Sequence, residues 1–200
     1  MNIERIEAIA REVMEAQRSY LEREPGWLYY HGRRTARLSQ WLVKELSARV
    51  DPDVVYTGAL FHDVGLGSEP HNQVGAQRTR ELLEAHCTAQ ELDAICDVIE
   101  HHSRRRNPSA PLAARIVQDA DLLDHVGIMG VWTTIYANGV NSVRFEEHQR
   151  THLNEQRVAT RLKLRRDLNF DVARKLFDLR VAEERAFFNR FHRVYVHGDG

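Results

Sequence analysis

The sequence predicts an all-α protein, a helical bundle that forms a single domain over residues 1–200. Apolar residues recur with helical periodicity along almost the whole chain, and no stretch alternates β-branched with polar residues as a half-buried strand would. The chain also has no internal repeat, low-complexity tract or linker-like segment that would divide it. Its 200 residues, 42% hydrophobic and 28% charged, have the size and balance of one globular domain.

Start and stop signals place the individual helices. Asp51-Pro52 is typical of an N-cap followed by a first helical turn, and the helix that it opens is expected to end at Gly65. Thr88 and Glu91 have the spacing of a capping box, which predicts the start of another helix. The predicted helices cover about residues 2–22, 31–48, 51–63, 72–86, 88–102, 112–125, 131–138, 144–165 and 170–194.

Charge and apolar patterning exclude several classes of protein. A formal net charge of −1 gives no global attraction for long nucleic acid, and no apolar run reaches the length of a membrane span. The first helix carries mixed charges rather than a secretory signal, so we expect a soluble, cytoplasmic protein. Cys87 and Cys96, outside any Cys-x-x-Cys pattern, predict free thiols. The apolar C-terminal helix packs either internally or against a second copy in a homodimer.

Eleven histidines in 200 residues direct attention to metal ligands. His62-Asp63 ends an apolar helix, His31 lies upstream near the head of another, and Asp121 lies in a mostly apolar helix downstream. An acid beside an apolar face is costly to bury unless it is paired or bound to a metal. Imidazole and carboxylate together suit Mn, Fe, Co, Ni or Zn, with Mg also expected to bind. Four ligands from three helices would leave positions open for water and substrate.

The order His…His-Asp…Asp on helices resembles the HD-domain superfamily of metal-dependent phosphohydrolases, and in particular its small bacterial hydrolases. The resemblance rests on His31, the blocks ALFHDVGLG (59–67) and VQDADLLDHVGIMG (117–130), Val74-Gly75-Ala76, and Ile99 to His102. It covers about residues 27–132 well, and the helices over about 144–194 are expected to pack on that core. The resemblance implies an HD-type helical fold.

The resemblance also implies metal ligation by His31, His62, Asp63 and Asp121. Asp119 is the alternative to Asp121 as the fourth ligand. In the family, the ligand acid precedes one variable residue and then a leucine, and this pattern favours Asp121. Asp119 would otherwise orient a ligand histidine. Some members of the superfamily hold a second metal with additional histidines, and His71 and His102 occupy matching places.

The chain departs from the family pattern where a basic residue contacts the substrate. Leu66 replaces a common lysine, and Leu122 stands where the subgroup has arginine. Arginine suits phosphate because its planar fork can bind two oxygens. Phosphate contacts are therefore expected from basic residues close to the ligands in sequence. The candidates are Arg33, Arg34, Arg104 and Arg105, with Arg106 beside them.

These observations predict a metal-dependent phosphohydrolase for a nucleotide or another small phosphorylated compound. A water activated by the metal would attack phosphorus, and Asp63, Glu69 and His71 are the candidate catalytic groups. Two alternatives stay open at this stage. One is a di-iron oxygenase of HD type, which needs His71 and His102 as additional ligands. The other is a ligand-sensing helical domain without catalytic activity.

Overall fold

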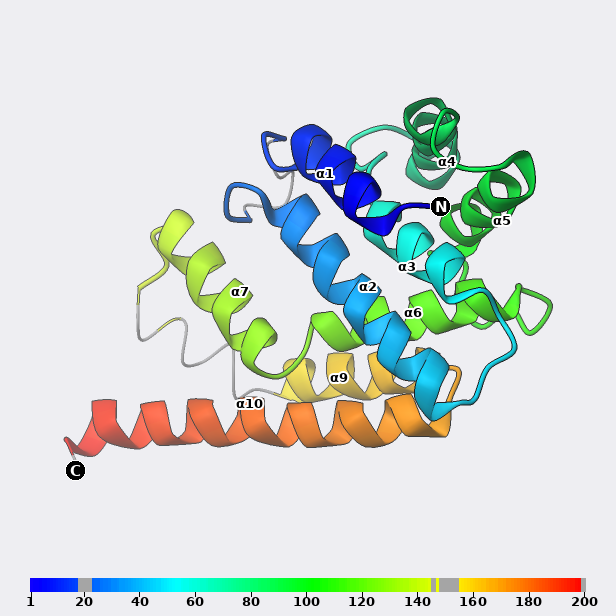
Figure 1. Ribbon diagram of the computed structural model, residues 1–200. Helices are drawn as coiled ribbons and strands as arrows, with labels where there is room; N and C mark the ends of the chain where they lie inside the picture. Colours follow the sequence, from blue (N-terminus) through cyan, green and yellow to red (C-terminus); the bar gives the residue numbers. More distant parts are fainter. Residues whose placement is uncertain (18–22, 145–146, 148–154, 199–200) are drawn as a thin grey trace.

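The computed structural model describes residues 1–17, 23–144, 147 and 155–198, and this part of the chain forms helices and no strand. The all-α prediction is therefore confirmed. Figure 1 shows the helices in chain order. They are α1 (Ile3–Met14), α2 (Trp27–Glu45), α3 (Pro52–Phe61), α4 (His71–Leu83), α5 (Ala89–His101), α6 (Leu112–Asp124), α7 (Ile128–Val140), α9 (Glu155–Asp167) and α10 (Asp171–His197).

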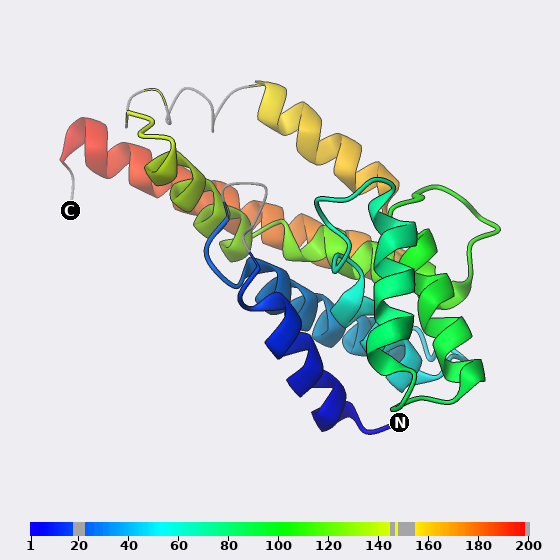
Figure 2. The same cartoon turned by 90° about the horizontal axis from the view of Figure 1, so that it is seen from above.

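Helix α3 is the centre of the bundle. It contacts α1, α2, α5 and α6, while α4 pairs with α5 beside it. The long helix α10 runs along one side of the bundle, where it contacts α2, α6, α7 and α9, and it reaches past the other helices towards the C-terminus (Figures 1 and 2). Every residue of α3 from Val54 to Phe61 is buried, which explains why this helix is apolar on all sides. His62 and Asp63 follow it directly, so the fold carries them into the interior.

The caps that the sequence signals are present. Asp51 accepts hydrogen bonds from the backbone of Asp53 and Val54, and Thr88 and Glu91 form a reciprocal capping box. Each cap satisfies amide groups that the first turn of a helix cannot pair internally. These two helix starts, at the beginning of α3 and α5, are confirmed.

Other helix boundaries differ from the expectation. The second helix begins at Trp27 rather than near residue 31, because Gly26 caps it with a left-handed backbone (φ 76°) instead of a polar side chain. His31 therefore lies inside α2 and not at its head. Helix α7 runs from Ile128 to Val140, so it begins earlier and ends later than the expected helix over 131–138. Helix α1 ends at Met14, and residues 18–22 and most of 145–154 lie outside the described part.

Within the described chain, none of the helices is both long enough and apolar enough to cross a membrane. The core includes apolar side chains from α1 to α6. Leu168, just before α10, and Ala173 and Phe177, within α10, belong to the same core. The predicted C-terminal helices therefore contribute to the same core as the central ones.

A glycine sets the distance between α2 and α3. A Cβ atom added to Gly32 would lie only 2.3 Å from the carbonyl oxygen of Leu60. The two backbones can therefore approach closely only because this position has no side chain. Gly32 directly follows His31, and Leu60 lies two residues before His62. The close approach of Gly32 to Leu60 therefore also determines how close the two histidines lie.

We predict that Gly32→Ala lowers the free energy of unfolding by about 1–3 kcal/mol, the usual cost of overpacking, although alanine favours helix. Gly139→Ala is the matched control, because a Cβ atom at this helical glycine meets nothing within 4 Å. It should raise the stability by about 0.5–1 kcal/mol through helix propensity alone. Urea unfolding followed by circular dichroism measures both. Equal effects of the two variants would contradict the close approach.

Candidate metal centre

Four side chains from three helices converge in the interior. His31 comes from α2, His62 and Asp63 from the end of α3, and Asp121 from α6. Asp121 Oδ1 lies 3.3 Å from His31 Nε2 and 3.8 Å from His62 Nε2, while Asp63 Oδ2 lies 3.8 Å and 3.5 Å from the same two nitrogens. Donor atoms around one tetrahedral ion with bonds of about 2.1 Å lie about 3.4 Å apart. The spacing of these four atoms therefore fits a single metal ion.

The two histidine rings are held so that their Nε2 atoms face the carboxylates. His31 donates a hydrogen bond from Nδ1 to Asp124 Oδ2 at 2.7 Å, and His62 donates from Nδ1 to the carbonyl oxygen of Ala59 at 2.7 Å. In the neutral ring, a proton on Nδ1 leaves Nε2 with a free lone pair. Both Nε2 atoms are buried and have no hydrogen-bond partner. A metal ion would give both of these atoms a partner, so the donor set fits a bound metal.

A chain of charges behind His31 fixes its orientation. Asp124 is buried and also accepts two hydrogen bonds from the Arg34 guanidinium, at 2.8 Å and 3.0 Å. Burial alone would raise the pKa of Asp124, but the hydrogen bonds from His31 and Arg34 outweigh it and lower the pKa. Burial would lower the pKa of His31, but Asp121 and Asp124 raise it to about 10. The ring therefore carries a proton on each nitrogen when no metal is bound, and a metal ion would replace the proton on Nε2. This triad of Arg34, Asp124 and His31 therefore behaves as one electrostatic unit.

The two carboxylates of the centre are stabilised as anions. Burial would raise the pKa of Asp63, but the imidazoles of His62 and His102 hold it below its ordinary value. Burial acts in the same direction on Asp121, and His125 and His31 hold the pKa of that carboxyl well below its ordinary value. Ionised carboxylates beside unpaired imidazole nitrogens are the ligand form that divalent ions require.

A second group of donors adjoins the centre on the side of Asp63. Donor atoms of Asp63, His71 and His102 lie within 4.8 Å of one another, and His102 Nε2 is 3.5 Å from Asp63 Oδ1. His102 is fixed by a hydrogen bond from Nδ1 to the carbonyl oxygen of Ile99. Its neighbour His101 turns away to Asp97. The structure thus brings His71 and His102 next to the four central residues.

Comparison with known proteins identifies the arrangement. The family model described as HD domain matches residues 28–125, which include the four central residues. This match identifies residues 28–125 as an HD domain. No curated protein matches the sequence significantly.

Solved structures share the fold across nearly the whole chain. An HD-superfamily hydrolase from Bacillus thuringiensis has a TM-score of 0.70 and 20% identity, covering 98% of this chain and 97% of its own. Bacillus subtilis YpgQ in complex with ADP has a TM-score of 0.67 and 18% identity, covering 99% and 100%. A predicted HD-superfamily hydrolase from an uncultured Thermotogales bacterium has a TM-score of 0.64 and 20% identity, covering 96% and 92%. At these identities the likeness establishes the HD-type fold.

Two side chains of the HD domain have a larger part in the site than the sequence suggested. Asp124 orients the ring of His31, and His125 adjoins Asp121. His125 Nε2 lies 3.2 Å from Asp121 Oδ1. Both residues follow Asp121 at the i+3 and i+4 positions, which share one face of a helix. That spacing was the available signal.

Asp119 lies away from the centre. Its carboxylate accepts hydrogen bonds from the backbone N–H and side-chain Nδ2 of Asn169, both at 2.8 Å, and from the N–H of Phe170 at 3.0 Å. Residues two apart on a helix face directions about 200° apart, so Asp119 and Asp121 cannot share one target. Asp119 thus anchors the start of α10 rather than orienting a ligand histidine.

The candidate arginines separate into distinct positions. Arg105 Nη2 lies 2.5 Å from Asp121 Oδ2, at the centre. Arg34 is engaged with Asp124 behind His31, and Arg33 faces α1, where its Nε lies 3.8 Å from Glu7 Oε1. Arg33 follows His31 by two positions and therefore points to the other side of α2. The structure thus places Arg33 on the side of α2 that faces α1, and its contact with phosphate stays a prediction.

The other basic and acidic candidates lie at the surface. Arg104 is exposed, and no hydrogen bond or ion pair joins it to the centre in the described chain; Arg106 pairs with Asp167. Glu69 is likewise exposed, on the loop before α4, without such a contact to the described centre. The expectation of Glu69 as a catalytic group is not supported by this placement, because an acid–base group must reach the reacting atoms.

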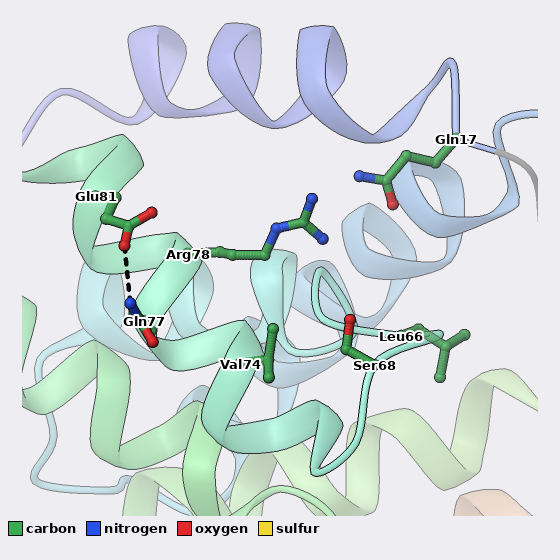
Figure 3. Close-up of a pocket in the computed structure, with 7 residues that line it drawn as sticks. All are labelled: Gln17, Leu66, Ser68, Val74, Gln77, Arg78 and Glu81. Carbon is green, nitrogen blue, oxygen red and sulfur yellow. Dashed lines mark hydrogen bonds between the residues drawn. The ribbon is translucent and has the colours of Figure 1, made fainter.

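A pocket of about 490 Å³ lies between the end of α1 and α4 (Figure 3). Arg78 and Gln17 reach towards each other across it, and Arg78 also donates a hydrogen bond to the carbonyl oxygen of Val64. Leu66 and Ser68 line it from the loop that follows Asp63. None of its lining residues is a donor of the metal centre, so the pocket adjoins the site without containing the chemistry.

We predict that Asp119→Ala lowers the free energy of unfolding by about 1–3 kcal/mol, because the half-buried backbone N–H groups of Asn169 and Phe170 lose their carboxylate acceptor. Metal binding by the folded protein should persist, whereas Asp121→Ala should abolish it. Asp178→Ala, which removes an exposed ion pair with Arg165, should change stability by less than about 1 kcal/mol. Denaturant unfolding and metal analysis after dialysis measure both properties. If the Asp119 variant lost its metal but kept its stability, Asp119 would be a metal ligand and not an anchor of α10.

Proposed function

We propose that this HD domain is a metal-dependent phosphohydrolase acting on a nucleotide or another small phosphorylated compound. The observation that carries the proposal is the pair of buried, unpartnered Nε2 atoms of His31 and His62, which face the ionised carboxylates of Asp63 and Asp121. These four residues would hold the ion. The HD-superfamily hydrolase fold supports metal-dependent hydrolysis in general.

The donor set favours a divalent transition metal. Two imidazoles and two carboxylates suit Mn, Fe, Co, Ni or Zn, and Mg remains compatible with the carboxylates. The chemistry such an ion supplies is activation of water for attack on phosphorus and neutralisation of charge on the phosphoryl oxygens. The residues of the chain hold and orient the donors. In particular, Asp124 fixes the tautomer and direction of the His31 ring.

Arg105 is the arginine best placed to bind the substrate. Its guanidinium contacts Asp121 and is partly exposed, so it can turn one edge to phosphoryl oxygens while staying at the centre. Arg34 contributes indirectly, because both of its hydrogen bonds to Asp124 hold the ligand His31. His71, half-buried beside Asp63, is the remaining candidate for moving a proton near the reacting atoms.

Two observations support a small phosphorylated substrate. A net charge of −1 provides no general attraction for long nucleic acid, and the acidic centre would repel a polyanion without its metal. YpgQ, which shares the fold, was solved with ADP, which supports a nucleotide as the class to test first. We further propose a cytoplasmic location for the protein.

A second candidate function rests on the group formed by Asp63, His71 and His102. Together with the other three central donors it provides six side chains, enough for two metal ions that share Asp63. Two iron ions held in that arrangement would favour an HD-type oxygenase. The purified protein would then contain two irons per chain and show the absorption band of oxidised iron. One ion per chain with phosphatase activity favours the hydrolase.

We predict that Asp63→Ala lowers hydrolysis with Mn²⁺ by at least about 100-fold, because it removes a ligand whose carboxylate faces two metal-binding imidazoles. The assay covers phosphomonoesters, phosphodiesters and nucleoside triphosphates. Asp97→Ala is the control, since among the described residues Asp97 pairs with His101 and lies outside the centre. Undiminished activity in the Asp63 variant would contradict the ligand assignment, and inactivity of the unaltered protein on every substrate would contradict hydrolysis.

We predict that Arg105→Ala lowers kcat/KM by about 10- to 100-fold, because a charge-assisted hydrogen bond to phosphate contributes about 1.5–3 kcal/mol. Arg104→Ala removes the same charge from the neighbouring exposed position and should change kcat/KM by less than about threefold. Steady-state kinetics on the best substrate measure both. Similar losses in the two variants would indicate a general effect of the basic loop instead of a specific contact.

A further inference from the structure

His125 lies beside the metal centre, next to His31 and Asp121. It directly follows α6 and is four residues after Asp121, so both side chains lie on one face. Its Nε2 is 3.2 Å from Asp121 Oδ1, and donor atoms of His31, Asp121 and His125 lie within 4.8 Å of one another. We propose that His125 is an additional metal ligand, which gives the centre a third imidazole. This inference rests on the proposed metal site and adds a residue to it.

The side chain of His125 is held in this position by ring packing. Its ring centroid lies 4.9 Å from that of His31 and 6.2 Å from that of Trp27. Trp27 in turn stacks on His31 with their planes 9° apart and is only 3% exposed. The three rings therefore form one packed group, and His125 has a restricted range of directions in which Nε2 can point. A ligand that is oriented before the metal binds loses less conformational entropy on binding.

The backbone at His125 is also fixed, by helices outside the matched HD domain. The turn after it is formed by Gly127, whose N–H donates a hydrogen bond to the buried carboxylate of Glu184 in α10. Glu184 pairs with Arg161 of α9 at 2.8 Å, and Arg161 donates to the carbonyl oxygen of His125 at 3.4 Å. The main chain that carries the imidazole is therefore tied to two further helices.

The unpartnered nitrogen of His31 provides independent support. His31 Nε2 is buried, has no hydrogen-bond partner and is shared by both donor groups, the one with His62 and Asp63 and the one with Asp121 and His125. An ion bound by His31 and Asp121 would thus lie next to His125 as well. Imidazole favours Co, Ni and Zn over Mg and Mn, so a third imidazole should shift the preference of the centre towards the former ions.

The test uses the full chain stripped of metal and reloaded with Co²⁺ or Mn²⁺. X-ray absorption of the Co²⁺ form counts the imidazole ligands, and competition with a chelator measures affinity for each ion. His125→Ala should reduce the count from three to two and weaken Co²⁺ by at least about tenfold, with a smaller effect on Mn²⁺. His101→Ala, a half-buried histidine directed to Asp97, is the matched control and should leave both properties unchanged.

A second variant keeps the test valid if His125→Ala does not fold. His125→Gln keeps a polar side chain of similar length without an imidazole, so it should show the same loss of one imidazole ligand and the same weakening of Co²⁺ binding. An unchanged imidazole count and an unchanged ratio of Co²⁺ to Mn²⁺ affinity would overturn the inference and leave His125 as a hydrogen-bond donor to Asp121. Failure of the unaltered protein to bind either ion would instead contradict the metal centre itself.

Discussion

The arrangement of the helices depends on the need to stabilise two carboxylates in the interior, the buried Asp121 and the half-buried Asp63. Asp63 and Asp121 remain ionised in the interior because imidazoles surround them on several sides. A buried anion without such partners would be strongly destabilising, and no single helix can supply partners on every side. Helices α2, α3, α5 and α6 must therefore meet at one point. The same convergence that stabilises the anions produces a set of donors with the spacing of a metal site.

Glycine makes this convergence sterically possible. Gly32 allows α2 to approach the backbone of α3 beside His31, and Gly65 allows the turn after Asp63 to pass close to α4. A Cβ atom at Gly65 would lie 2.2 Å from the carbonyl oxygen of His71 and 2.5 Å from the nitrogen of Gly75. His71 comes near Asp63 for this reason. The glycines of the sequence blocks around the ligands thus position donors, although they contribute no chemistry themselves.

The parts of the site that were predictable are those determined within one helix. Asp51 and Thr88 mark helix starts by local hydrogen bonding, and the apolar helix α3 carries His62 and Asp63 inward whatever the loops do. Helical geometry also separates Arg33 from His31, a signal that the expected phosphate contact of Arg33 left out of account. The role of Asp119 was not accessible in the same way, because it depends on the backbone of residues 169 and 170, fifty positions away. Exposure of Glu69 depends likewise on the path of a loop.

Helix α6 shows why the HD domain alone does not account for the site. Asp121 lies near the middle of a segment that α10 and its preceding turn contact on both sides of this residue. Before it, Asp119 binds the backbone at residues 169 and 170; after it, Glu184 binds the N–H of Gly127. Both contacts use buried carboxylates and therefore fix α6 along its axis and about it. Because the position of a ligand oxygen depends on the helix that carries it, the C-terminal helices belong to the functional unit even though they supply no donor.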